Sequence, residues 1–195
     1  MRKILLTTSL FLTIGALAQT EATTKDGKKV MLNPNGTWMY SECASLLKTE
    51  NTGGKMMTSS KDDITIPATT TSTGLSISII KGSESVIFNF ATLSKDIYCV
   101  SKDAPMAVSF TDGTSIQIKH MGSLNCKGNF AFFLGESMGN KNILEALINK
   151  QIKKVVIDYS DTENGKIKII SKETVFDAKT AGKVMHVAQC LSNLQ

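Results

Sequence analysis

One short segment of this chain has the residue types and the spacing of a catalytic nucleophile. Residues 135–139 read G-E-S-M-G, which fits the G-x-S-x-G pattern of a strand-to-helix turn that exposes a serine hydroxyl. Asp177 and His186 follow Ser137 in the chain, in the order of nucleophile, acid and base. Asp158 and Asp161 are further candidates for the acid. This set of residues points to a serine hydrolase or esterase.

The elements around Ser137 argue against that activity. The nucleophile turn of such hydrolases belongs to parallel strands joined by helices, whereas residues 74–134 have the pattern of hairpins. No glycine-rich segment that could form an oxyanion hole precedes the motif. With this glycine and serine content, a chance match arises in about one of ten chains of this length. We therefore expect no catalytic residue and keep Ser137, His186 and Asp177 as the alternative site.

The remaining candidates for chemistry are few. His120 and His186 are the only histidines, and neither belongs to a closely spaced ligand pair, so we expect no metal site and no cofactor. His120 follows a predicted strand, where water or backbone groups would satisfy its ring. Asp158, Asp161 and Glu163 place oxygen ligands near one loop, but not in the order of a calcium loop, and a solvated hairpin tip is expected there.

Four cysteines are spread over the chain: Cys43, Cys99, Cys126 and Cys190. None belongs to a C-x-x-C pair, so the sequence indicates neither a thioredoxin-like redox centre nor a zinc ribbon. The even number permits two disulfides in any of three connectivities, and the sequence leaves the choice open. We expect structural bridges or buried thiols.

The first 18 residues have the features of a secretory signal peptide. Arg2 and Lys3 precede an apolar run over residues 4–17, and Ala16-Leu17-Ala18 supplies the small residues of a cleavage site. The run is too short to span a bilayer stably. Its removal lowers the formal net charge from +5 to +3, and the remaining lysines are scattered, so nucleic acid is not an expected partner. Export to the periplasm or the outer surface is expected.

Residues 19–40 are predicted to form a β meander of three short strands. The turns K-D-G-K and N-P-N-G contain the residues that tight hairpins require. Residues 41–73 are rich in Ser and Thr and are predicted to be a linker, interrupted by a helical turn near residues 44–47 and a short strand at residues 63–67. Within the linker, the glycine pair 53–54 and the tract 69–73 are the most linker-like.

The meander segment, D-G-K-K-V-M-L-N-P-N-G-T-W-M-Y, resembles a motif of uncharacterised exported proteins of Gram-negative bacteria, in which D-G-x-x-V-x-L and G-T-W-x-Y strands follow the signal directly. It covers about 15 residues. The layout F-x-D-G-T-x-I-x-I-x-H-x-G at residues 110–122, followed by a Cys and a C-terminal helix, is similar to other exported bacterial proteins. The resemblance implies an envelope or secreted protein and implies no catalytic residue.

Residues 74–195 are predicted to form an antiparallel α+β domain, sandwich-like, with two helices. Apolar residues alternate with polar ones over residues 75–79, 84–91, 97–100, 106–110, 115–120 and 129–134, which is typical of half-buried strands. A further hairpin is predicted over residues 152–171, with Val155, Ile157, Ile167 and Ile169 as its apolar positions.

The two helices are recognised by apolar residues at spacings of three and four. Asn140 can cap the first, whose apolar face consists of Ile143, Leu144, Leu147 and Ile148. The second is predicted over residues 173–193 and ends the chain, with one face formed by Ala181, Val184, Ala188 and Leu191.

The function that fits these features best is that of an exported, non-catalytic binding or envelope-associated protein, whose partner is an envelope component, a glycan or a protein. The serine hydrolase with Ser137 and His186 is the first alternative. The second is a structural or self-assembling envelope protein that pairs through exposed strand edges.

Overall fold

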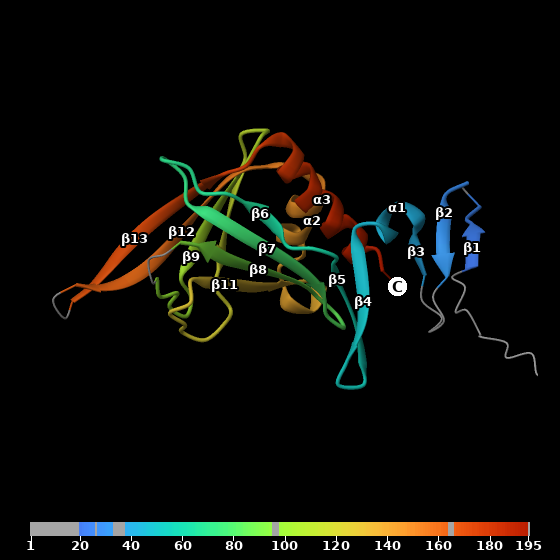
Figure 1. Cartoon of the computed structure of the whole chain (residues 1–195), viewed down its shortest axis with the longest axis horizontal. Coiled ribbons are helices and arrows are strands. Elements are labelled where there is room, and N and C mark those ends of the chain that lie inside the picture. Colours follow the sequence, from blue (N-terminus) through green and yellow to red (C-terminus); the bar gives the residue numbers. More distant parts are fainter. Residues whose placement is uncertain (1–19, 26, 33–37, 95–97, 164–165, 195) are drawn as a thin grey trace, which may run out of the picture.

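The computed structural model of the chain describes residues 20–25, 27–32, 38–94, 98–163 and 166–194. Most of this backbone is antiparallel β structure, and the last of three α-helices lies at the C-terminal end (Figure 1). The predicted α+β class is thereby confirmed. The predicted signal peptide, residues 1–18, lies outside the described residues.

A small three-stranded sheet precedes the main body of the molecule (Figure 1). It consists of β1 (Thr20–Thr23), β2 (Lys29–Leu32) and β3 (Trp38–Tyr40), which pair antiparallel in sequence order and confirm the predicted meander. The rings of Trp38 and Tyr40 meet edge to face with centroids 5.4 Å apart, so the only tryptophan closes this cluster.

The largest sheet has six strands. They are β4 (Leu47–Thr52), β5 (Lys55–Ser60), β6 (Ile64–Ile66), β7 (Gly74–Lys81), β8 (Val86–Leu93) and β11 (Asn129–Leu134). The pairing order is β11-β8-β7-β5-β4, and β6 pairs with β7 further along the edge that β5 occupies.

This arrangement corrects the prediction of a linker over residues 41–73. The segment contains α1 (Ser41–Ala44) and three strands, because β4 and β5 form an exposed hairpin that needs few apolar residues. Gly53 and Gly54 have φ angles of 60° and 82° and form its tight turn. The predicted strand at residues 63–67 is confirmed as β6, but the helical turn predicted near 44–47 begins at Ser41 instead.

The second large sheet has four strands in the order β10-β9-β12-β13. They are β9 (Pro105–Phe110), β10 (Ser115–Lys119), β12 (Ile152–Glu163) and β13 (Lys166–Val175). The hairpin of β12 and β13 is longer than predicted and projects from one end of the molecule (Figure 1).

Backbone hydrogen bonds join the two large sheets at two places. At one, the amide of Thr73, just before the central strand β7, donates to the carbonyl of Glu173 in the edge strand β13 at 2.8 Å. At the other, the amide of Met121, just after β10, donates to the carbonyl of Ala131 in the edge strand β11 at 2.9 Å. The inner faces of the two sheets therefore enclose one core.

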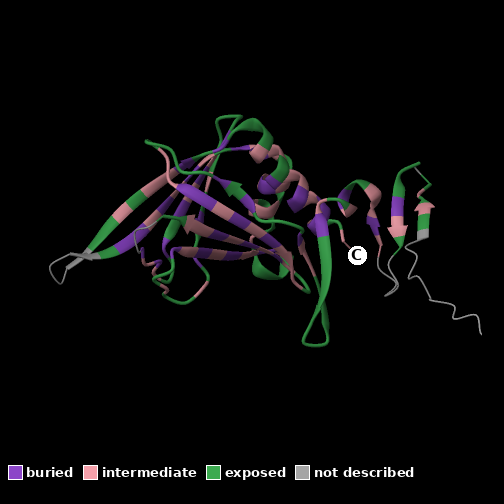
Figure 2. Ribbon diagram, in the orientation of Figure 1, coloured by how far each residue is buried: buried purple, intermediate pink, exposed green. Residues whose placement is uncertain are grey.

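That core is built from alternate residues of the strands, as the sequence pattern predicts, and Figure 2 shows buried and intermediate positions alternating along strands such as β7 and β8. Its largest side chains, each at most 1% exposed, include Phe88, Phe90, Phe110, Phe130, Phe132 and Tyr159. The helices α2 (Lys141–Asn149) and α3 (Ala178–Ser192) complete it, and α3 contacts β7 and β6 of one sheet and β12 of the other.

The apolar face predicted for α3 is confirmed, since Ala181, Val184, Ala188 and Leu191 are all buried. The predicted start near residue 173 is wrong, because β13 runs to Val175. Asp177 instead caps the helix, accepting a hydrogen bond from the amide of Thr180 at 2.8 Å.

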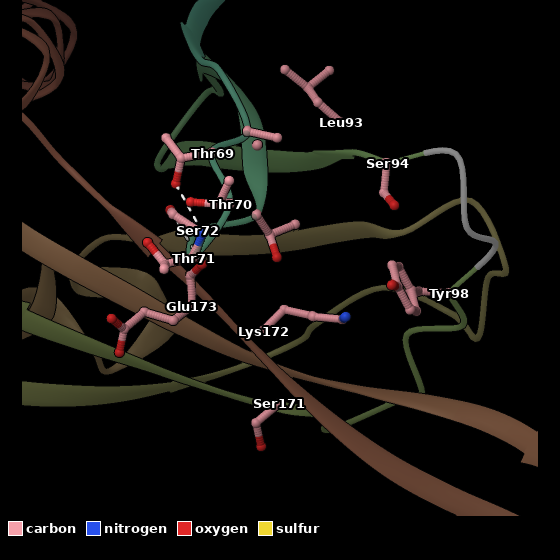
Figure 3. Close-up of a pocket in the computed structure, with 13 residues that line it drawn as sticks. Thr69, Thr70, Thr71, Ser72, Leu93, Ser94, Tyr98, Ser171, Lys172 and Glu173 are labelled. Atoms are coloured by element: carbon pink, nitrogen blue, oxygen red, sulfur yellow. Dashed lines mark hydrogen bonds between the residues drawn. The ribbon is translucent and has the colours of Figure 1, made fainter.

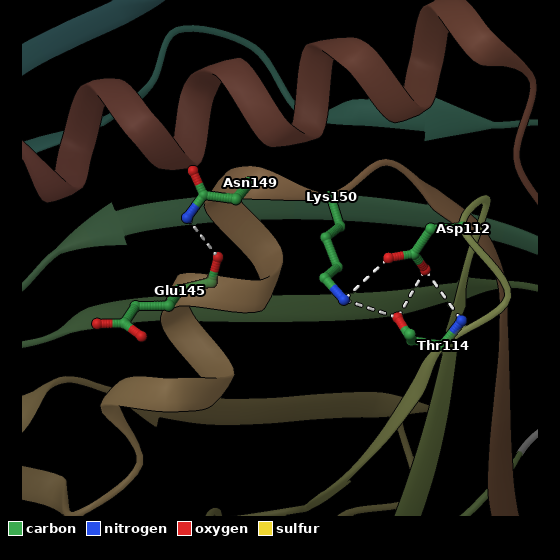
Figure 4. Close-up of polar contacts among 5 residues, drawn as sticks. All are labelled: Asp112, Thr114, Glu145, Asn149 and Lys150. Atoms are coloured by element: carbon green, nitrogen blue, oxygen red, sulfur yellow. Dashed lines mark hydrogen bonds and ion pairs between the residues drawn. The ribbon is translucent and has the colours of Figure 1, made fainter.

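The helix α2 is tied to the turn between β9 and β10 by a polar cluster (Figure 4). The ammonium of Lys150 lies 2.9 Å from a carboxylate oxygen of Asp112 and donates to the hydroxyl of Thr114 at 2.9 Å. The same carboxylate accepts hydrogen bonds from the amide and the hydroxyl of Thr114. These contacts fix a turn whose Asp-Gly sequence already favours it.

The cysteines form two disulfides, Cys43–Cys190 and Cys99–Cys126. The first connects α1 to α3 across 147 positions of the sequence, and the second connects two loops 27 positions apart. This settles which of the three connectivities is present, and two disulfides suggest an oxidising, exported environment. Among the described residues, no helix has the length and the apolar character needed to cross a membrane.

Candidate binding site

The three residues of the predicted hydrolase do not come together in the structure. Ser137 is exposed on a short 3₁₀ turn after β11, and no hydrogen bond joins it to His186 or Asp177, all three being described residues. Asp177 caps α3 while His186 lies nine positions further along that helix, a rise of about 13 Å. The acid therefore cannot orient the histidine ring, as a triad requires.

The other predicted candidates have structural partners. His120 is 2% exposed; its Nδ1 accepts from the amide of Ala131 at 3.0 Å and its Nε2 lies 3.2 Å from the carbonyl of Ser123. The prediction that backbone groups satisfy this ring is confirmed. Asp158 lies within β12 and accepts a hydrogen bond from the hydroxyl of Ser171 at 2.6 Å, so it belongs to the hairpin and not to its tip.

A hollow of about 460 Å³ lies where the end of β8, the segment before β7 and the middle of β13 meet (Figure 3). Most of its lining carries hydroxyl groups, and one cation reaches into it. Its lining residues are Ala68, Thr69, Thr70, Thr71, Ser72, Thr73, Gly74, Leu93, Ser94, Tyr98, Ser171, Lys172 and Glu173. Hydroxyls both donate and accept hydrogen bonds, so such a wall suits a polar ligand.

The wall formed by residues 69–73 is held in place by β13. The amide of Thr73 donates to the carbonyl of Glu173, and its own carbonyl accepts from the hydroxyl of Thr174 at 2.7 Å. The hydroxyl of Ser72 accepts from the amide of Val175 at 3.1 Å. The tract with the most linker-like composition is thus a fixed wall, because its partners lie about a hundred positions away and leave no local signal.

The register of β12 and β13 determines which side chains face this hollow. Lys172 pairs with the buried Ile157, and Thr174 pairs with the buried Val155, so both lie on the inner face of the sheet. Ile169, predicted as an apolar position of the hairpin, lies on the outer face and is 61% exposed. A change of one residue in the pairing register exchanges the two faces of a strand, and the alternating sequence alone does not fix the register.

The ring of Tyr98 lies beneath the ammonium of Lys172, and Tyr159 packs against that ring. That ammonium lies 5.0 Å from the centroid of the Tyr98 ring, and the Tyr159 ring lies 5.2 Å from Tyr98 on centroids. Burial raises the pKa of Tyr159 to about 12, so its hydroxyl stays protonated and bonds to that of Thr92. The Cys99–Cys126 disulfide anchors the chain directly after Tyr98.

A smaller hollow of about 270 Å³ contains His186. It lies between α1 and the ends of α2 and α3, and is lined by Glu42, Asn149, Gln189 and both cysteines of the Cys43–Cys190 disulfide, among others. Gln189 donates to the carbonyl of Ile148 at 2.6 Å, which uses this polar group to join the two helices. Ser137 does not line this hollow.

Comparison with protein families, with characterised proteins and with solved structures found no match for this chain. The arrangement of its own residues therefore carries the functional argument. No sequence pattern predicted the hollow beside Lys172. The sequence marks Lys172 only as sharing one face of β13 with Ile170 and Thr174, and it does not fix whether that face points inward.

Proposed function

We propose that this protein is an exported, non-catalytic binding protein that works in the periplasm or at the outer surface, and that the hollow beside Lys172 is its binding site. The observation that carries the proposal is the hydroxyl-rich wall at residues 69–73, whose last two residues, Ser72 and Thr73, are fixed to β13 by hydrogen bonds. A wall that is already ordered loses little conformational entropy when a ligand binds. Its partner is an envelope component, a glycan or a protein.

Two features support export. The sequence begins with a charged, apolar and small-residue pattern typical of signal peptides. The two disulfides, Cys43–Cys190 and Cys99–Cys126, are of the kind that persists in oxidising compartments.

The alternatives have less support from the geometry. The hydrolase requires Ser137, His186 and Asp177 to share one cleft, but Ser137 does not line the hollow that contains His186, and Asp177 lies about 13 Å along the helix from His186. Self-assembly through strand pairing requires an exposed edge strand whose backbone groups can bond to another chain. The edge strand β4 carries the exposed ion pair of Lys48 and Glu50, and charges on an edge strand discourage pairing with another chain.

A blocking variant tests the proposed site. Thr70→Trp places a large ring in the hollow, and Thr65→Trp makes the same change at an exposed position of β6 outside it. The wild-type protein, immobilised with both disulfides intact, is expected to retain a component of cell-envelope extract that mass spectrometry or glycan analysis identifies. Thr65→Trp should retain it equally and Thr70→Trp should lose it.

The proposal is overturned if the wild-type protein retains nothing specific, or if Thr70→Trp and Thr65→Trp retain the same component to the same extent. Circular dichroism melts of the two variants establish that both are folded.

A further inference from the structure

We infer that the ligand of this hollow is an anionic saccharide whose negative group pairs with Lys172. The inference rests on the proposed function and specifies the chemistry of the ligand. It follows from the position of Lys172, from the charges around it and from the groups that line the rest of the hollow.

The position of Lys172 is unusual for a lysine. It occupies an inward site of β13, between Ile170 and the buried Thr174, where strand alternation calls for an apolar side chain. A charge on the inner face of a sheet is costly unless a partner or water stabilises it. Its ammonium lies over the Tyr98 ring, and no carboxylate of the described residues forms an ion pair with it.

The nearest acid in the lining is already neutralised. The carboxylate of Glu173 lies 2.8 Å from the ammonium of Lys154 on the outer face of the sheet. In Figure 3 the side chains of Lys172 and Glu173 extend in opposite directions from β13. Within the described lining, Lys172 therefore supplies the positive charge that a ligand would meet.

The ring of Tyr98 does not serve as a platform on which a ligand could stack. It is 6% exposed, and it contacts Lys172 and the ring of Tyr159. Tyr98 instead positions the ammonium, so recognition depends on hydrogen bonds and charge. Leu93, 42% exposed, supplies a limited apolar surface.

A ligand that matches this lining carries several hydroxyl groups beside one anionic group. The hydroxyls of Thr70, Thr71 and Thr73 line the hollow and can exchange hydrogen bonds with sugar hydroxyls, because each can donate and accept. The anionic group can be a carboxylate, a sulfate or a phosphate, since an ammonium pairs with each as a point charge.

The test uses a panel of immobilised oligosaccharides in which each uronate, sulfate or phosphate form stands beside its uncharged counterpart. Binding of the full disulfide-bonded protein is measured at low and at physiological salt. The wild-type protein should bind at least one charged form about tenfold or more tightly than its counterpart, because a charged hydrogen bond is lost in the latter. The preference should weaken as salt rises.

Three variants assign that preference to the lysine. Lys172→Met keeps the length of the side chain and should abolish the preference, while Lys172→Arg keeps the charge and should retain it. Lys183→Met removes the same charge from an exposed position of α3 away from the hollow and should behave as the wild type. Melting curves confirm that each variant is folded.

Equal binding of charged and uncharged forms, with Lys172→Met unchanged, overturns the ligand class and leaves the binding function standing. If the protein retains no saccharide but captures an envelope protein through the hollow, the ligand class is likewise overturned and the binding function stands. Failure of both the panel and the envelope extract overturns the proposed function as well.

Discussion

His120 shows how one buried polar side chain holds two sheets together. Its Nδ1 accepts a hydrogen bond from the amide of Ala131 in β11, and its Nε2 lies within hydrogen-bond distance of the carbonyl of Ser123 in its own loop. Its ring lies 5.3 Å from that of Phe130. His120, one of the two histidines that could act as a catalytic base, therefore has a structural role. The charge that faces the hollow belongs to Lys172, which no sequence motif marks.

The close approach of Gly122 to this ring gives a prediction. A Cβ at Gly122 would lie 2.7 Å from Cε1 and Nε2 of His120, and the buried ring has no room to move. We expect Gly122→Ala to lower the free energy of unfolding by about 1–3 kcal/mol, measured by urea denaturation. Gly182→Ala is the control, because a Cβ there meets only Gln151 at 3.9 Å. The control should gain up to about 1 kcal/mol from helix propensity.

The carboxylate of Asp112 gives a prediction about pH. Hydrogen bonds from Thr114 and the ammonium of Lys150 lower its pKa to about 2. Because the folded state holds the pKa below that of the unfolded chain, this stabilisation is complete above about pH 4 and is lost as the pH falls through 2. Asp112→Asn should melt at a lower temperature than the wild type at pH 7, and the two melting temperatures should converge toward pH 2. A constant difference across this range would contradict the assignment.

Among the helices and strands, some features depend on the residues of one element and others on contacts with distant elements. The apolar faces of α2 and α3 and the alternation of the strands are predictable, since each depends on the residues of one element. The ends are not. Asn140 begins α2 as predicted, but its side chain makes no helix cap, and it joins β11 instead.

The joint between β11 and α2 can be tested through Asn140. Its amide oxygen accepts from the amide of Gly135 at 2.9 Å, and its amide nitrogen donates to the carbonyl of Phe133 at 2.8 Å. Asn140→Ala should cost about 1–2 kcal/mol of unfolding free energy, because two partly buried backbone groups lose their partners. Asn149→Ala removes an exposed bond within α2 and should cost less than about 0.5 kcal/mol. Equal losses would show that the Asn140 bridge contributes nothing.

At the scale of the molecule, the two disulfides close loops of very different length. In the loop-entropy model, removing Cys43–Cys190 costs about 5 kcal/mol and removing Cys99–Cys126 about 3.5 kcal/mol. We therefore expect the double variant Cys43→Ala, Cys190→Ala to be less stable in guanidinium denaturation than the double variant Cys99→Ala, Cys126→Ala. The reverse order would mean that the short loop around Tyr98 constrains the native state more than chain entropy predicts.

The sequence by itself determined the α+β class, the N-terminal meander, most strands and the apolar faces of two helices, because these depend on turn residues and on spacings within short segments. The tertiary structure alone decided the cysteine pairing, the register that turns Lys172 inward and the wall at residues 69–73. The physical reason is distance along the chain: the bond between Thr73 and Thr174 joins residues 101 positions apart. No local pattern records such a contact, and only the packed core brings its partners together.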